Sequence, residues 1–304
     1  MKERLEYQGF IQEVQKQLQE ATGKKAVFEK EHDFHDFDQD RILVRLQGSK
    51  EECQVYSVPC KTLFQFYQEG SEIPEIMDKL LSELGSFQKL LGKDTLEQLQ
   101  DYEHARARLF IRLKSSSALG VEKSCHDLVG DIALVLYYWA GEDGERSVML
   151  PVPEIFLERW GLPKETVMRQ AMEHTMELAP PSIYDMLKNC LIPGYRGDLF
   201  MEKEIDLAQI FPCICLSTTK LAYGAAAIFY PGVAKRIAEE LDSDLYLVFT
   251  SENELFIHKT GSAEVKGLKW AMKAAVQKGG EPEEFLTRNI YRYDRAADSF
   301  QIAE

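Results

Sequence analysis

The residues of this chain best suited to chemistry lie in one short segment. Ser251, Glu252, Asn253 and Glu254 follow one another, and His258 comes four residues after Glu254. A hydroxyl, carboxylates and an imidazole are the groups that acid–base and nucleophilic catalysis use. Their spacing matches no known catalytic motif, and polar residues are ordinary at a hairpin tip. We keep Ser251, Glu254 and His258 as an alternative site, for an enzyme of unknown class.

A second group of residues is cationic. The segment ARARLFIRLK, residues 105–114, alternates strictly between apolar and other side chains, which predicts a β-strand. One face of this strand would carry Arg106, Arg108, Arg112 and Lys114. Such a face suits an acidic protein or an anionic ligand. The alternative is an ordinary solvated face whose cations pair with carboxylates elsewhere.

Three other clusters contain residue types that bind metals or act as nucleophiles. The loop His32–Asp38 is rich in His and Asp, but its spacing fits no EF-hand or zinc pattern, so we expect a loop and no metal site. Cys125, His126 and Asp127 are adjacent, and neighbours on an extended chain point apart. Cys213 and Cys215 would share one face of a strand, where burial as small apolar groups is the usual outcome.

The bulk composition excludes several classes of protein. The 304 residues carry a net charge of −14, which repels nucleic acid and anionic membranes. No apolar run reaches the ~20 residues of a spanning helix, and the start MKERLEYQGF lacks the apolar centre of a signal peptide. Phosphate-binding, dinucleotide, nucleophile-elbow and zinc-protease motifs are missing. We expect a cytoplasmic protein with reduced cysteines and no cofactor.

The elements around the alternative site form the clearest pattern in the chain. The range 223–277 begins with the apolar run Ala225–Tyr230, which we interpret as a strand. An amphipathic helix follows Pro231-Gly232, and the alternating runs Asp244–Phe249 and Glu254–Lys259 predict a hairpin. A second amphipathic helix ends the range. Strand, helix, hairpin and helix together make a compact α-and-β unit.

The rest of the chain extends the same pattern. A helix over residues 3–21 precedes three strand-like runs, Lys25–Glu29, Arg41–Leu46 and Gln54–Val58. We expect an α+β fold of mostly antiparallel sheets flanked by helices, with an N-terminal portion 1–118 and a C-terminal portion 119–304. The latter holds a helical insertion, 151–190, with helices that include Ser182–Asn189. The connector 190–212 has no clear period and no assigned role.

Two segments of these portions are alike. VPCKTLFQFYQEG with IPEIMDKLLSEL resembles VPEIFLERWG with LPKETVMRQAMEHT, because each has a Pro, a short aromatic helix, a Gly, a Pro and a longer helix. An ancient duplication would make the two portions related. The other explanation is that Pro is common at helix starts in general.

The order of segments resembles an uncharacterised bacterial family, domain of unknown function 5688. The similar segments are GFIQEVQKQL, the LFQFYQEG segment, DLVGDIALVLYYW, WGLPKETVMRQAMEHTMELAP, YGAAAIFYPGVAKRIAEELDSDLYLVFTS and PEEFLTRNIYRYDR. The family has a Pro-Ser-Ser-x-His-Glu-like segment where this chain has residues 249–254. Ser251 and Glu254 match that pattern, and Asn253 stands in the place of His. The resemblance implies no assigned activity.

These observations favour a non-enzymatic intracellular module that binds a protein or an anionic ligand through its cationic strand. We predict no nucleic-acid or membrane partner. The absence of catalytic motifs and the cationic face motivate this prediction. Whether the protein is an enzyme stays open, as do its partner, its pathway and its oligomeric state.

Overall fold

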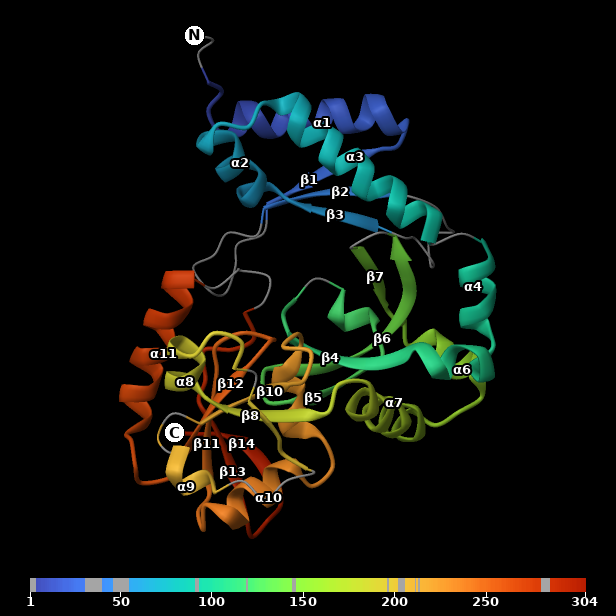
Figure 1. Ribbon diagram of the computed structural model, residues 1–304. Coiled ribbons are helices and arrows are strands. Elements are labelled where there is room, and N and C mark those ends of the chain that lie inside the picture. The colour runs from blue at the N-terminus through green and yellow to red at the C-terminus, as the bar shows by residue number, and fades with distance from the viewer. Residues whose placement is uncertain are drawn as a thin grey trace. The chain divides into compact units, whose positions relative to one another are not determined.

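The computed structural model describes residues 4–30, 40–45, 55–90, 93–118, 120–143, 146–195, 197–201, 206–210, 212, 214–279 and 285–304. Within them the chain forms helices and antiparallel sheets, which confirms the predicted α+β class (Figure 1). It divides into two compact units. The first unit is Met1–Leu96 with Gly141–Val148, and the second unit is Glu97–Ala140 with Met149–Glu304. A relation by duplication between the portions 1–118 and 119–304 stays a prediction.

The first unit is a meander covered by helices. Its elements are α1 (Tyr7–Thr22), β1 (Ala26–Glu29), β2 (Arg41–Arg45), β3 (Val55–Pro59), α2 (Cys60–Glu69) and α3 (Ile73–Leu90). The three strands pair antiparallel in sequence order, and α1 ends at Gly23, whose φ of 63° suits glycine. The predicted helix and three strands are therefore confirmed, while the loop His32–Asp38 lies outside the described residues.

The core of the first unit lies between its helices and its sheet. Phe10 and Val14 of α1 are fully buried, as are Ile42, Val44 and Val58 of the strands. The rings of Phe10 and Tyr67 stack at 4.9 Å, which joins α1 to α2. Figure 1 places α1, α2 and α3 on the same side of this small sheet. Helix α4 (Lys93–Gln100) follows α3 along the chain.

The second unit begins with the sheet that holds the cationic strand. The elements here are α5 (Tyr102–Ala105), η1 (Arg106–Arg108), β4 (Leu109–Ser115), η2 (Val121–Lys123), β5 (His126–Val129), β6 (Ile132–Asp143) and β7 (Arg146–Pro151), of which the parts of β6 and β7 within Gly141–Val148 belong to the first unit. The strand order is β4-β6-β5, with β7 also paired to β6. The predicted strand from Arg106 is wrong at its start, since residues 106–108 form a 3-10 turn that continues α5.

Helix α7 (Lys164–Leu178) packs on the apolar face of β4, after α6 (Ile155–Trp160). Leu109, Ile111 and Leu113 are each only 1 % exposed on that face. Two polar contacts fix the pair: the amide of Ile111 donates to Thr175 Oγ1 at 2.8 Å, and His174 Nδ1 lies 2.8 Å from the carbonyl of Leu109. The other face of β4 is thus left to Phe110, Arg112 and Lys114.

A larger antiparallel sheet makes up the rest of the second unit. Its strands are β8 (Pro181–Asp185), β9 (Asp198–Leu199), β10 (Ile214–Thr218), β11 (Leu245–Phe249), β12 (Leu255–Lys259), β13 (Tyr291–Asp294) and β14 (Ser299–Ile302). Their order is β14-β13-β11-β12-β10-β8-β9. The predicted hairpin is confirmed as β11 and β12. The predicted helix from Ser182 is wrong at its start, because the chain pairs with β10 before α8 (Met186–Leu191) begins.

The apolar run Ala225–Tyr230 is a 3-10 helix and not the predicted strand. All of the run except Tyr230 lies within η3 (Gly224–Phe229), and Ala225, Ala226, Ala227 and Ile228 are fully buried there. Small alanines let the turn lie directly against β10, so burial and not strand pairing explains the apolar run. The helices α10 (Val233–Glu240) and α11 (Val265–Gly279) are confirmed, and α9 (Leu207–Ile210) lies in the connector.

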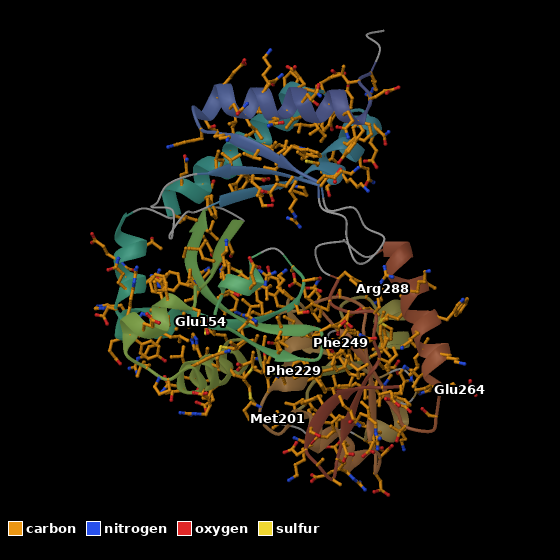
Figure 2. All side chains as sticks on the ribbon, turned by 180° about the vertical axis from the view of Figure 1, so that it is seen from behind. Glu154, Met201, Phe229, Phe249, Glu264 and Arg288 are labelled. Atoms are coloured by element: carbon orange, nitrogen blue, oxygen red, sulfur yellow. The ribbon has the colours of Figure 1, made fainter. Side chains whose placement is uncertain are left out.

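Aromatic side chains fill the space between η3 and the large sheet. Figure 2 labels Phe229 and Phe249 close to each other. Their rings are 6.2 Å apart and nearly parallel, at 8°. Phe229 also contacts Phe300 of β14 at 4.9 Å.

Across the described part of the chain, no helix is both long and apolar enough to cross a lipid bilayer.

Candidate functional site

Two cations of β4 meet one carboxylate inside the second unit. Arg112 Nη2 lies 2.7 Å from Glu252 Oε1, and Lys114 Nζ lies 3.0 Å from Glu252 Oε2. The side chains are 13 %, 18 % and 5 % exposed for Arg112, Lys114 and Glu252. Burial removes the screening by water that weakens surface ion pairs. This buried ionic centre therefore joins the predicted cationic strand to the predicted 249–258 hairpin.

The guanidinium of Arg112 also contacts aromatic rings. It lies 3.7 Å from the centroid of the Tyr223 ring and 5.0 Å from that of Tyr137. Both distances are within the range of cation–π attraction, which grows when water is removed. Burial raises the pKa of Tyr137, so this phenol stays neutral beside the cation. The sequence pattern had not marked Tyr137 or Tyr223, because neither lies near Arg112 along the chain.

Backbone hydrogen bonds hold the hairpin tip against the start of η3. The amide of Gly224 donates to the carbonyl of Asn253 at 3.1 Å, and the amide of Ala225 donates to that of Glu252 at 3.1 Å. The amide of Tyr223 donates to Asn253 Oδ1 at 3.0 Å. These contacts fix Glu252 beneath Tyr223. Asn253 thus acts as a structural link, where the resembled family pattern has His.

Gly224 makes this close approach possible. A Cβ at this position would lie 2.1 Å from Ser217 Oγ and 2.6 Å from the backbone nitrogen of Thr218, so a side chain has no room. Just before it, Tyr223 adopts a left-handed φ of 54°, which is unfavourable for a bulky residue. Strain of this kind persists where surrounding contacts hold it, often at functional sites. The ring of Tyr223 is thereby aimed at Arg112.

Glu254, at the other end of the tip, belongs to a second buried cluster. The hydroxyl of Tyr184 donates to Glu254 Oε2, and the thiol of Cys215 lies 3.6 Å from the same oxygen. Burial is the main cause that raises the pKa of both Tyr184 and Cys215. Both groups therefore keep their protons, and Cys215 is not an activated nucleophile.

The three residues of the alternative site do not form a hydrogen-bonded triad. Ser251 Oγ accepts a hydrogen bond from the amide of Asn253 at 3.1 Å. His258 is on β12 opposite Tyr246 of β11, and burial lowers its pKa. Glu254 and His258 are four positions apart on an extended segment, a distance of about 13 Å. The imidazole and this carboxylate are thus too far apart for direct proton transfer.

The first two cations of the predicted strand lie apart from the buried ionic centre. Arg106 is exposed on η1, where its Nε lies 3.2 Å from Glu103 Oε2. The guanidinium of Arg108 lies 5.8 Å from the ring centroid of Trp139, which is 37 % exposed. The four predicted cations therefore divide into a buried pair and a surface pair, a correction to the single cationic face.

A row of three aromatic rings with a cation at each end lies between the two pairs. Phe110 and Tyr137 are directly paired across β4 and β6, with ring centroids 5.9 Å apart. Arg108 and Trp139 come next towards the solvent, and Arg112 comes next towards Glu252. We call Arg108, Trp139, Phe110, Tyr137 and Arg112 the cation–aromatic row. Phe110, Arg112, Tyr137 and Trp139 share one face of the sheet because each strand alternates with a period of two, and Arg108 of η1 comes just before β4.

The described residues of the remaining predicted clusters have structural partners or are buried. Cys125 is buried, and burial raises the pKa of its thiol to about 11. Asp127 Oδ1 pairs with Lys164 Nζ at 3.0 Å, and His126 Nδ1 lies 2.8 Å from the carbonyl of Ser124. Cys213 lies outside the described residues. No group of three or more His, Cys, Asp and Glu side chains placed to hold a metal is found among the residues that the structure describes.

Asp131 makes another buried polar cluster that the sequence pattern did not indicate. Its carboxylate accepts hydrogen bonds from the hydroxyl of Thr287 at 2.8 Å, from Asn289 Nδ2 at 3.0 Å and from the hydroxyl of Tyr291 at 2.5 Å. Burial raises the pKa of Tyr291, and its ring is fully buried. These bonds tie the turn between β5 and β6 to the C-terminal strands, so we interpret the cluster as structural.

An apolar hollow lies elsewhere in the second unit. Its volume is about 440 Å³, and its lining comes from the end of α7 and from residues near β9 and α10. The lining residues are Glu173, Met176, Glu177, Pro180, Pro181, Leu199, Met201 and Pro231. It includes none of the predicted site residues, so the buried ionic centre and this hollow are separate features.

The fold and the site define an α+β protein with a buried ionic centre and, beyond it, a half-buried Arg108 against the exposed Trp139. The chain belongs to a family of unknown function, DUF5688, whose sequence profile matches residues 7–295 of the 304. Neither the curated proteins nor the solved structures contain a match. Family membership confirms the resemblance of the segments and leaves the molecular function to physical argument.

Proposed function

We propose that the protein is a binding module that recognises a partner carrying an anionic group next to an aromatic or apolar group. The observation that supports it is the position of Arg108 over Trp139 at the exposed end of the cation–aromatic row. A guanidinium held over an indole presents a planar cation and an apolar surface together. Tryptophan and arginine are also the residues most enriched at binding hot spots.

The buried end of the row supports this proposal through rigidity. Arg112 is fixed by Glu252 and by the rings of Tyr137 and Tyr223, so the neighbouring ring pair Phe110–Tyr137 has a fixed base. Preorganised side chains lose less entropy on binding than mobile ones. The cations at the two ends of the row thus have different roles in this proposal: Arg112 positions the row, and Arg108 contacts the partner.

Arg108 suits an anionic partner better than the other predicted cations. Within the described part of the chain, no carboxylate lies at ion-pair distance from Arg108, whereas Arg106, Arg112 and Lys114 all have one. A cation that has no carboxylate partner can bind an anion without first losing an internal ion pair. The contribution of Arg106 in this proposal is long-range attraction.

A titration with phenyl phosphate, which combines a ring and a dianion, tests the proposal. Binding should change the tryptophan fluorescence. Both Arg108→Glu and Trp139→Ala should weaken the binding of phenyl phosphate by roughly tenfold, which is about 1.4 kcal/mol. Inorganic phosphate and benzyl alcohol, with one feature each, should bind much more weakly. Arg169→Glu, on the exposed side of α7, is a matched control that should leave binding unchanged.

Two results would contradict the proposal. The first is equal binding by wild type and Arg108→Glu with an unchanged melting temperature. The second is turnover of the phenyl phosphate, which would favour the alternative enzyme with Ser251, Glu254 and His258 near its site. The separation of Glu254 from His258 disfavours that alternative, and the apolar hollow of the second unit is lined by other residues.

A further inference from the structure

Helix α11 carries a stripe of exposed lysines around one exposed tryptophan. Lys266, Lys269, Trp270 and Lys273 are separated by three, four and seven positions from the first, so they share one side of the helix. All four are exposed, and Trp270 is 75 % exposed. Leu268 and Met272, on the other side, are 7 % and 4 % exposed. We call these four outer residues the α11 stripe.

The charge of the α11 stripe is opposite to that of the protein. The chain has 50 Asp and Glu against 36 Lys and Arg, yet the range 265–279 contains lysines and no acidic residue. Glu264 lies just before the helix, at its lower end in Figure 2. Among the residues given a structure here, no carboxylate lies at ion-pair distance from Lys266, Lys269 or Lys273. Within the described part of the chain, the stripe is therefore a local cationic surface.

The exposure of Trp270 needs a separate explanation from the charge. A tryptophan side chain is large and mostly apolar, so leaving it in water forgoes the favourable free energy of burying it. Other tryptophans of this chain are more covered, such as Trp160, whose Nε1 donates to the carbonyl of Leu99 at 3.0 Å. Tryptophan is among the residues most enriched at binding hot spots. α11 lies along the outside of the second unit, where a partner can reach it (Figure 1).

We propose that the α11 stripe docks a short acidic segment of a partner protein, with one apolar side chain of that segment packed on Trp270. Lysines on both sides of Trp270 provide charge complementarity, and the indole provides the apolar anchor. This surface is separate from the cation–aromatic row, so the inference goes beyond the proposed function. It would account for both the local charge and the exposed ring.

The net negative charge of the protein favours a short acidic segment over a large anionic partner at the α11 stripe. At physiological salt, charges act over about 8 Å, so a segment that touches only the stripe experiences mainly its lysines. A nucleic-acid duplex or an anionic bilayer would also bring its charges near the acidic remainder of the protein, which carries a net −14 overall. Electrostatics therefore favours a polypeptide segment as the occupant.

The experiment uses a labelled synthetic peptide rich in glutamate with one central phenylalanine, titrated into the full chain and followed by fluorescence anisotropy. The wild type should bind, and the emission of Trp270 should shift to shorter wavelength. The double variant Lys269→Glu/Lys273→Glu should bind at least roughly tenfold more weakly, as should Trp270→Ala. A peptide with alanine in place of phenylalanine should also lose affinity.

A matched control variant has the same net charge as Lys269→Glu/Lys273→Glu. Lys123→Glu/Lys235→Glu makes the same charge change at exposed positions on η2 and α10, and it should bind the peptide like the wild type. Equal loss in both double variants would overturn the inference, as would the absence of peptide binding. Binding of anionic vesicles or duplex DNA as tight as that of the peptide would overturn it as well. Arg108→Glu should not change peptide binding, which separates this result from the proposed function.

Discussion

Arg112 and Glu252 form an ion pair of 2.7 Å although 140 residues separate them in the chain. Arg112 belongs to β4 of the smaller sheet of the second unit, and Glu252 lies at the tip of the β11–β12 hairpin of the larger sheet. The pair thus connects two sheets through charges that are both nearly buried. Its integrity should matter for stability as well as for binding.

Removing the carboxylate should destabilise the protein strongly. Glu252→Gln leaves Arg112 and Lys114 buried without a counter-charge, and breaking a buried pair in this way typically costs about 3–5 kcal/mol. Urea unfolding followed by circular dichroism measures the loss. The exposed pair gives the control, because Glu103→Gln should change the free energy of unfolding by no more than about 0.5 kcal/mol. Equal effects of the two substitutions would contradict the buried ionic centre.

Two glycines should respond in opposite directions to the same substitution. Gly224→Ala places a Cβ against Ser217 and the backbone of Thr218, so we expect destabilisation by about 1–3 kcal/mol. Gly267→Ala, on the exposed side of α11, meets no atom within 4 Å and should stabilise the helix by up to about 1 kcal/mol. Melting temperatures of both variants check this. A neutral Gly224→Ala would show that the hairpin tip is not held closely against η3.

The free energy of unfolding should decrease as the pH falls, because of His258. Burial lowers its pKa in the folded protein below the unfolded value of about 6.5. The folded state therefore favours the neutral imidazole, and its contribution is fully present above pH ~6.5 and is lost as the pH falls towards the lowered pKa. Unfolding free energies of wild type and His258→Gln, compared across this range, should converge at low pH. A difference that is constant with pH would contradict the prediction.

The buried thiols should be unreactive in the folded protein. Burial is the main cause that raises the pKa of Cys60 to about 12 and that of Cys125 to about 11, and it also raises that of Cys215. Since the thiolate is the reactive form, alkylation by iodoacetamide should be slow at these three residues until urea unfolds the chain. Mass spectrometry of digested samples identifies the modified residues. Rapid labelling of Cys215 in the folded protein would instead support the enzyme hypothesis.

Local patterns predicted most of the elements correctly. Alternation predicted the hairpin β11–β12 and the meander β1–β3, and helical spacing predicted α1, α10 and α11, because these signals depend on neighbours within a few positions. The errors have physical causes. The apolar run predicted to be a strand is instead the 3-10 helix η3, because its small side chains allow it to be buried in that form. Ser182, predicted to start a helix, belongs to a strand because it pairs with β10.

The candidate site could be predicted only in parts. Arg112, Lys114 and Glu252 were each marked by their residue types, yet nothing near them in sequence indicated that they meet. Tyr137, Tyr223 and Trp139 carried no local signal, because an aromatic residue in a strand or turn is ordinary. For the α11 stripe, in contrast, the spacing of the lysines in the sequence already indicates that they share one side of the helix. The structure adds which side of the helix is buried.

The sequence by itself determined the α+β class, the acidic charge of −14, the main helices and the family. These properties follow from composition, local periodicity and the order of segments. Only the tertiary structure decided that two of the four predicted cations are buried against Glu252 while Arg108 faces Trp139. Long-range packing sets which charges lose water and which keep it, and this depends on residues far apart in the chain.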